Sequence, residues 1–199
     1  MKTKTFVKIC SRVASIAVLF AAALSASAGA PQTVSPGSAA PDLTFKDQFE
    51  KETKLISQYK DQMILIIAWD RVGNDYLSNW MNAVRKVYPG GPNRVVTFVF
   101  LANFKGAPGF LQDNIKRKYQ KTTDGKQNGA ILLDWDGTFA KTFGFHDDVT
   151  NVYLVDAKGI LRATAYGKGT GDEVQPILRE IGNLSANAPK GPNPTESRR

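Results

Sequence analysis

The amino-acid sequence predicts an α/β domain with three layers, in which helices flank a central mixed sheet. Two apolar runs, residues 63–70 and 94–104, have the composition of strands that are buried on both faces. Between them, residues 75–88 carry apolar side chains at helical spacing. Near the end of the chain, residues 151–156 and 160–167 are two strand-like runs joined by a short turn, which predicts a hairpin.

The first helix and its successor are expected to connect parallel strands. Asn74 or Asp75 could cap the helix over 75–88, and a Pro-Gly-Gly-Pro run ends it. A second helix is expected over residues 108–120. Its inward side chains would be Phe110, Leu111, Ile115 and Tyr119. Buried strands joined by helical crossovers imply parallel pairing.

The second half of the chain completes the order β-α-β-α-β-β-β-α. Residues 130–135 are expected to form the third strand and residues 139–145 a short helical turn. After the hairpin, residues 170–184 have the pattern of an amphipathic helix. Thr170 and Glu173 are spaced as a capping box at its start.

The N-terminal residues have the three parts of a signal peptide. A basic segment is followed by an apolar run over residues 13–24 and by the small residues Ala26-Ser27-Ala28. We expect cleavage after Ala28 and a periplasmic or secreted mature protein. The run is short for a bilayer span, so membrane attachment is expected only if the segment stays uncleaved.

Beyond the signal peptide of residues 1–28, composition divides the chain into three parts. Residues 29–41 read as a linker, residues 42–184 as one domain, and residues 185–199 as a disordered tail rich in Pro, Asn and Ala. The single cysteine, Cys10, lies in the signal peptide. The mature chain is therefore expected to have no thiol, which excludes thiol chemistry and thiolate metal sites.

Charge also restricts the possible partners. The signal peptide holds four of the 26 Lys and Arg residues, which leaves 22 against 18 Asp and Glu, a net charge of +4. Basic residues do not alternate with aromatic residues in a run, so nucleic acid is not an expected partner. We expect an unknown periplasmic protein or small ligand instead.

Four segments in a fixed order carry a family resemblance. They are APDLTFKD (40–47), ILIIAWD (64–70), LLDWDGTFAKTFGF (132–145) and VYLVDAKGILRATAYG (152–167). Together they resemble periplasmic thioredoxin-like proteins of the TlpA and AhpC/TSA kind, and most of all the small YtfJ-type proteins that share this plan without a cysteine pair. The resemblance implies a thioredoxin-like fold over residues 42–184.

The chain departs from this family where the family does its chemistry. Thioredoxins place C-x-x-C after the first core strand, at a helix N-terminus that lowers the pKa of a thiol. This chain has Asp-Arg-Val-Gly-Asn-Asp over residues 70–75. In the slot of the family's cis-proline, before the hairpin strand, it has Thr150. The expected protein is therefore a redox-inactive binding or accessory protein; the alternative is an enzyme of the same fold with non-thiol chemistry.

A second alternative comes from residues 132–139, which resemble the opening motif of haloacid-dehalogenase phosphatases. In that interpretation Asp134 is the nucleophile and Asp136 the acid/base. However, too little chain follows for the later elements of such an enzyme. A strand that ends in an Asp136-Gly137 turn accounts for the same residues without catalysis.

Other candidate motifs are weak. The glycine-rich segment 167–171 lacks the spacing of a phosphate loop and is expected to be a turn. His146 is the only histidine, and beside Asp147 and Asp148 it does not form a recognisable set of metal ligands. We expect neither a metal nor a cofactor, and no catalytic residue is assigned.

The remaining hypothesis is a polar cleft at the carboxyl ends of the parallel strands, where open α/β sheets bind ligands. In the thioredoxin arrangement, the loop after the first core strand lies beside the loop before the hairpin. A helix N-terminus near Arg71 would favour an anion there, whereas the carboxylates would favour a cation. The residues of this predicted cleft are Asp70, Arg71, Asn74, Asp75, His146, Asp147, Asp148 and Thr150.

Overall fold

The computed structural model describes residues 33–123 and 129–187. The strands are β1 (Thr44–Asp47), β2 (Glu52–Lys54), β3 (Ile64–Trp69), β4 (Thr97–Asn103), β5 (Ile131–Asp134), β6 (Thr150–Val155) and β7 (Leu161–Gly167). The α-helices are α1 (Leu77–Val87), α2 (Gln112–Thr123), α3 (Thr138–Phe143) and α4 (Gln175–Ala186). Short 3-10 turns precede three of these helices: η2 (Gly73–Tyr76), η3 (Gly109–Leu111) and η4 (Asp172–Val174); a fourth, η1 (Ser57–Tyr59), follows β2.

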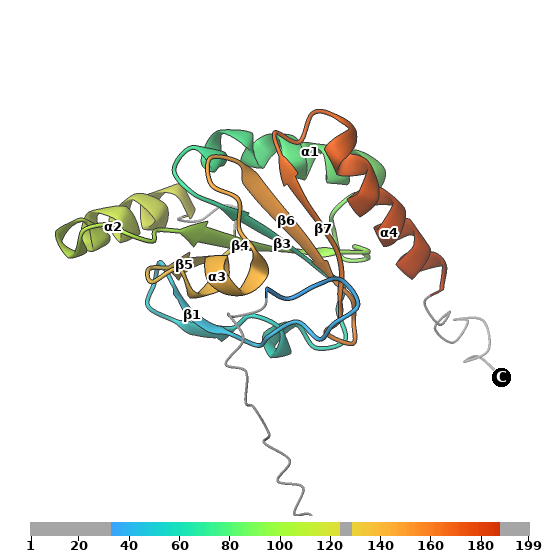
Figure 1. Cartoon of the computed structure of the whole chain (residues 1–199), viewed down its shortest axis with the longest axis horizontal. Helices are drawn as coiled ribbons and strands as arrows, with labels where there is room; N and C mark the ends of the chain where they lie inside the picture. The colour runs from blue at the N-terminus through green and yellow to red at the C-terminus, as the bar shows by residue number, and fades with distance from the viewer. Residues whose placement is uncertain (1–32, 124–128, 188–199) are drawn as a thin grey trace, which may run out of the picture. The chain divides into compact units, whose positions relative to one another are not determined.

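All seven strands belong to one mixed sheet in the order β2-β1-β5-β4-β3-β6-β7 (Figure 1). Strand β4 pairs in parallel with β3 and β5, while β6 pairs antiparallel with β3 and β7. These pairings confirm the predicted parallel centre and the predicted late hairpin. Because β6 runs antiparallel to β3, the chain enters β6 beside the point where it leaves β3.

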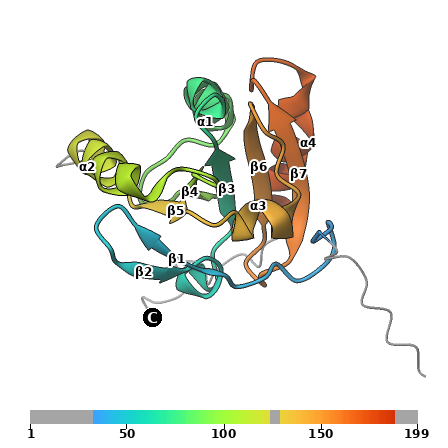
Figure 2. The same cartoon turned by 60° about the vertical axis from the view of Figure 1, so that its left-hand side comes forward.

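Helices cover both faces of the sheet, as predicted. Strand β3 is buried throughout, and its side chains alternate between two cores. Ile64 and Ile66 pack in the core under α3, together with Phe139. Leu65 and Ile67 pack in the core under α1 and α4. Figure 2 shows α1 and α2 over the same face of the sheet and α3 over the other.

The β1–β2 hairpin was not predicted from the sequence. Strand β2 has only three residues, and Thr53 alone among them is buried, so the alternating apolar pattern of a strand is missing. Polar groups fix the hairpin instead. The Asp47 carboxylate accepts hydrogen bonds from the backbone N–H groups of Phe49 (2.8 Å) and Lys51 (3.0 Å).

The stretch before β1 is bonded to the domain in the part that the structure describes. The N–H of Val34 donates to the carbonyl of Thr142 (2.8 Å), and the N–H of Gly37 donates to the carbonyl of Leu161 (2.7 Å). Residues 33–41, where composition predicts a linker, therefore run along α3 and β7. The predicted signal peptide of residues 1–28 lies outside the described residues.

The start of the second helix differs from the expectation. Phe110 is 80% exposed and Leu111 is 37% exposed, so neither points into the core. Both belong to η3, and α2 begins only at Gln112. Tyr119, by contrast, packs against the aromatic cluster at the end of β4, as predicted.

The C-terminal helix continues into the predicted tail. Helix α4 ends at Ala186, and residues 188–199 lie outside the described part of the chain. No helix of residues 33–123 and 129–187 is long and apolar enough to cross a membrane.

Candidate functional site

The predicted cleft corresponds to two loops at one edge of the sheet. The first loop leaves β3 at Asp70, and the second runs from His146 into β6 at Thr150. The register pairs Ala68 of β3 with Asn151 of β6, so the two loops continue side by side beyond that pair. The structure thus brings together the two groups of residues that the sequence assigned to this site.

Asp70 joins the two loops through its carboxylate. Oδ1 accepts a hydrogen bond from the N–H of Gly73 in its own loop, at 2.7 Å. Oδ2 accepts one from the N–H of Asp148 in the other loop, also at 2.7 Å. Asp148 has a φ of 62°, a left-handed conformation that few non-glycine residues adopt. The carboxylate of Asp70 therefore stabilises the strained turn at Asp148, and both of its oxygens already accept hydrogen bonds from the protein.

Thr150 makes a second connection between the loops. Its side chain is fully buried, and Oγ1 donates to the carbonyl of Gly73 at 2.7 Å. The peptide bond before Thr150 is trans, as are all peptide bonds of the described residues. Thr150, which the sequence resemblance aligns with a cis-proline, thus has a side chain that bonds across the site.

Gly73 lies so close to the second loop that only glycine fits. A Cβ atom at position 73 would be 2.3 Å from the carbonyl oxygen of Val149. Gly73 is the first residue of η2, which ends at Tyr76. Gly73 is therefore a point of close backbone contact between the first loop and residues Val149 and Thr150 of the second.

The helix N-terminus near Arg71 is not free, contrary to the expectation. The N–H of Gly73 is bonded to Asp70, the N–H of Asn74 donates to the carbonyl of Asp70 at 3.1 Å, and the N–H of Asp75 donates to the carbonyl of Val72 at 3.1 Å. The predicted cap by Asn74 or Asp75 is also wrong, because Tyr76 occupies the N-cap position of α1 without a side-chain bond. Free backbone N–H groups were the reason to expect an anion near Arg71, and these groups already have acceptors within the protein.

His146 is positioned by two residues that sequence reasoning missed. Asn151 accepts a hydrogen bond from the N–H of His146 (2.8 Å) and donates to its carbonyl (2.8 Å). The imidazole stacks on the ring of Tyr166, with centroids 3.7 Å apart. Asn151 and Tyr166 are partners in the β6–β7 ladder, so the register of the hairpin could have revealed the group only once β6 was located.

The other predicted residues lie on the surface of this edge. Arg71, Asn74, Asp75, His146, Asp147 and Asp148 are exposed, Asp70 is half-buried and Thr150 is buried. Val72, which was not predicted, is 37% exposed between them. Within residues 33–123 and 129–187, no group of three or more His, Cys, Asp or Glu side chains could hold a metal ion. The edge therefore offers polar contacts around a histidine–tyrosine stack.

The aspartate motif after β5 forms a structural turn. Asp134 is 1% exposed, and its carboxylate accepts hydrogen bonds from the N–H groups of Thr138 (3.0 Å), Phe139 (3.1 Å) and Ala140 (3.3 Å). Burial, with the adjacent Asp136 carboxyl, raises the pKa of Asp134 to about 6. Both oxygens accept bonds from N–H groups at the start of α3, so the carboxylate acts as the cap of this helix.

Comparison with solved structures supports the same fold. The pneumococcal exposed lipoprotein thioredoxin Etrx1 from Streptococcus pneumoniae has a TM-score of 0.52 and 18% identity, and the match covers 72% of this chain and all of that one. A peroxiredoxin-like protein from Aquifex aeolicus has a TM-score of 0.52 and 12% identity, over 78% and 90% of the two chains. A DsbF homologue from Corynebacterium diphtheriae has a TM-score of 0.50 and 15% identity, over 80% and 96%.

No protein-family model matches the chain, and no curated protein matches it. The structural similarities establish a thioredoxin-like fold, as the sequence predicted, and at these identities they establish the fold alone. The haloacid-dehalogenase alternative implies a different fold, and in this structure the Asp134 carboxylate is bonded to the start of α3.

Proposed function

We propose that this chain is an exported, redox-inactive thioredoxin-fold protein that recognises a partner protein through the loop edge at Arg71, Asp75 and His146. The observation that carries the proposal is the pair of bonds that Asp70 and Thr150 make across the two loops. These bonds stand where the related fold keeps its reactive groups, and they give the edge one fixed shape.

A fixed edge suits binding better than catalysis. Preorganised loops lose little conformational entropy when a partner binds, which favours affinity. The same bonds occupy the groups that could have reacted, because both carboxylate oxygens of Asp70 and the hydroxyl of Thr150 have partners. Among the described residues, the His146 ring stacks on Tyr166 and has no hydrogen-bonded nucleophile beside it.

Thiol chemistry lacks its nucleophile. The only cysteine in the sequence is Cys10, outside the thioredoxin-like domain. Disulfide exchange and thiol peroxidase reactions both start from a thiolate. Insulin reduction and peroxide consumption by residues 29–199 should therefore equal the buffer blank.

The chemistry of the edge favours a basic partner segment. Three exposed carboxylates, of Asp75, Asp147 and Asp148, surround the site, and the backbone donors that would have attracted an anion are bonded internally. Tyr166 is 53% exposed beside His146, and aromatic side chains of this kind are enriched at protein interfaces. A lysine- or arginine-containing loop of an envelope protein would complement both features.

Site-specific photo-crosslinking tests this proposal. A photoreactive amino acid replaces Val72, which is exposed in the loop, and a matched protein carries it at Arg179, which is exposed on α4. The labelled proteins are expressed with their signal peptide and irradiated in cells. Position 72 should give a discrete crosslinked product that position 179 does not give.

Alanine variants then link the product to the edge. Asp75→Ala and His146→Ala should each reduce the position-72 product at least severalfold without a change in melting temperature, because both side chains are exposed. Equal crosslinking from positions 72 and 179, or no effect of either substitution, would place recognition elsewhere on the molecule.

A further inference from the structure

A trough lies on the sheet face between α1 and α2, and its upper end reaches Asn74 of the first loop. Figure 2 shows the two helices over the same face, with β4 running between them. The side chains of β4 are buried to different extents on the two faces of the sheet. Val99 and Leu101, on the α3 side, are 2% and 0% exposed, whereas Phe98 and Phe100, on the α1 and α2 side, are only partly buried.

Two hollows follow this strand and share Phe100 as a common floor. The first, which we call the lower hollow, has a volume of about 370 Å³ and lies at the start of β4, where Arg85, Arg94 and Phe98 line it. The second, which we call the upper hollow, lies toward the end of β3 and has a volume of about 120 Å³. Its walls are mostly apolar and come from β3, α1, α2 and β5: Trp69, Leu77, Met81, Tyr119 and Ile131. Together the hollows reach the size of small-molecule sites, roughly 300–1,000 Å³.

The two arginines of the lower hollow have no acidic partner in the described part of the chain. No carboxylate of residues 33–123 and 129–187 lies within 4 Å of either guanidinium. The guanidinium of Arg85 lies over the ring of Phe98, 5.3 Å from its centroid. The Nε of Arg94 donates to Thr97 Oγ1 at 2.9 Å, which orients the fork.

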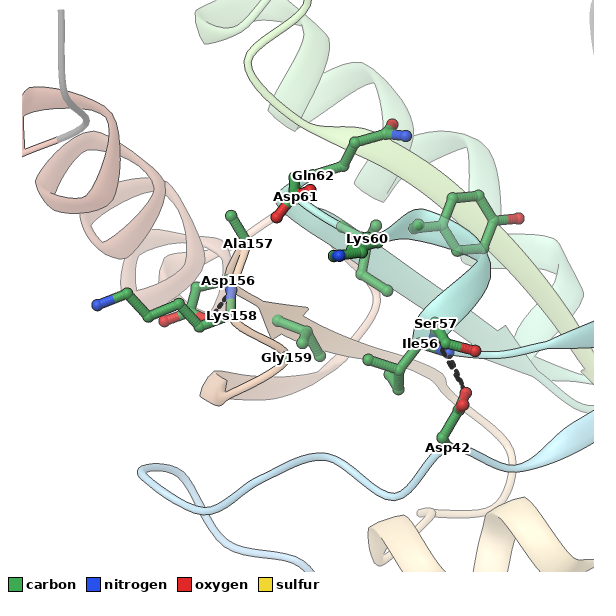
Figure 3. A pocket seen from close by; sticks show the side chains of 13 residues that line it. Asp42, Ile56, Ser57, Lys60, Asp61, Gln62, Asp156, Ala157, Lys158 and Gly159 are labelled. Atoms are coloured by element: carbon green, nitrogen blue, oxygen red, sulfur yellow. Dashed lines mark hydrogen bonds between the residues drawn. The ribbon is translucent and has the colours of Figure 1, made fainter.

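A third hollow, at the turn of the β6–β7 hairpin, has a different character (Figure 3). Its volume is about 360 Å³, and Asp42, Asp61 and Asp156 supply its three carboxylates, of which Asp42 and Asp156 are already bonded. Asp42 accepts hydrogen bonds from the N–H groups of Ile56 and Ser57, and Asp156 accepts them from Lys158 and Ile160. The trough differs from this hollow because it combines two arginines with an aromatic floor of Phe98 and Phe100.

We propose that this trough binds an amphipathic carboxylate, with the carboxylate between Arg94 and Arg85 and the apolar chain over Phe100 toward Trp69. An arginine pairs with a carboxylate through two parallel hydrogen bonds, which selects this charge and this geometry. The partly buried aromatic floor gains from contact with an alkyl chain. Arg85 also faces the negative end of the α1 dipole, so Arg94 contributes more of the selectivity.

Decanoate titrated into residues 29–199 tests the site by two-dimensional ¹H–¹⁵N NMR. The indole N–H of Trp69 donates to Tyr119 beside the upper hollow at 3.4 Å, whereas the indole N–H of Trp80 donates to Gly167 at 3.0 Å, away from the trough. Decanoate should shift the Trp69 indole signal saturably and leave the Trp80 signal in place. Decylammonium, with the same chain and the opposite charge, should bind at least about tenfold more weakly.

Variants separate the site from general attraction to a basic protein. Arg94→Gln should weaken decanoate binding about tenfold and Arg85→Gln less, whereas Arg179→Gln on α4 should leave it unchanged. Thr122→Trp, at the exposed mouth of the upper hollow, should block the chain. Absence of a saturable Trp69 shift, equal binding of decylammonium, or equal losses in the Arg94 and Arg179 variants would overturn the proposal. None of these outcomes bears on the crosslinking at position 72.

Discussion

Two aspartates lie at the carboxyl ends of β3 and β5, on either side of β4, and their carboxylates have different structural roles. Asp134 ends β5 and binds the N–H groups of residues four to six positions later, so its bonds are local. Asp70 follows β3 and binds one N–H three residues away and another 78 residues away. A local cap stabilises one turn, whereas the bridge of Asp70 defines the shape of an edge made by two distant segments.

The two carboxyls also differ in burial. Asp134 is 1% exposed and its pKa is raised to about 6, because burial disfavours its charge and Asp136 lies nearby. Asp70 is half-buried and remains open to solvent on one side. The carboxylate of Asp134 therefore stabilises a buried turn, whereas that of Asp70 fixes the shape of an accessible surface.

The largest expected effect tests how tightly the two loops at Asp70 are packed. Gly73→Ala should destabilise the domain by about 3 kcal/mol, because the new Cβ atom would overlap the Val149 carbonyl. Urea denaturation measures the change. Gly109→Ala is the matched control, since no atom lies within 4 Å of its Cβ position. Comparable midpoints for both variants would show that the loops can separate at little cost.

The local cap should come next. Asp134→Ala should cost about 2 kcal/mol, since it leaves buried N–H groups at the start of α3 without an acceptor. Asp136→Ala should cost less than half as much, because its carboxylate is exposed and the backbone N–H of Thr138 that it accepts from is also bonded to Asp134. A larger loss in the Asp136 variant would reverse the assignment of the capping residue.

The long-range bridge should have a smaller effect on stability and a larger one on local order. Asp70→Asn keeps one acceptor and loses the other, which should cost about 1.5 kcal/mol. Amide hydrogen exchange at Asp148 should accelerate well beyond the rise expected from global destabilisation. Asp75→Asn, in the same loop, should change neither quantity. Unaltered exchange at Asp148 in the Asp70 variant would contradict the bridge.

The smallest effect is the pH dependence of the cap. The pKa of Asp134 is about 6 in the folded protein and 3.8 for an aspartate in the unfolded chain, so the folded protein binds this proton more tightly. Its contribution to stability therefore rises as pH falls from about 6 toward 4. Between pH 7 and pH 5, wild type should gain on the order of 1 kcal/mol relative to Asp134→Asn. A difference that stays flat across this range would rule out the raised pKa.

Local patterns in the sequence predicted most of the fold. The buried runs of β3 and β4, the helical spacing of α1 and the turn of the β6–β7 hairpin each depend on residues close in the chain. The β1–β2 hairpin was not predicted because hydrogen bonds to Asp47 stabilise it, and its strands lack an alternating apolar pattern. Phe110 was misplaced because helical spacing cannot tell where a 3-10 turn precedes the helix.

The candidate site was predictable in membership but not in connectivity. The sequence indicated which loops would meet, because the order of elements determines the topology. It could not indicate that Asp70 points across to Asp148, or that Thr150 bonds to Gly73, because both contacts join residues more than 70 positions apart. Tyr166 joined the site only through the strand register, which is a tertiary property.

The contact at Gly73 has a consequence for protein engineering. Grafting a reactive thiol onto this scaffold at Gly73 means placing a Cβ and a sulfur atom where the Val149 carbonyl already stands. A designer would first have to retract the backbone before β6, and the hydroxyl of Thr150 would lose its acceptor as that backbone moved. Converting this scaffold into an oxidoreductase therefore requires a redesign of the backbone, because substituting Gly73 alone leaves no room for the new side chain.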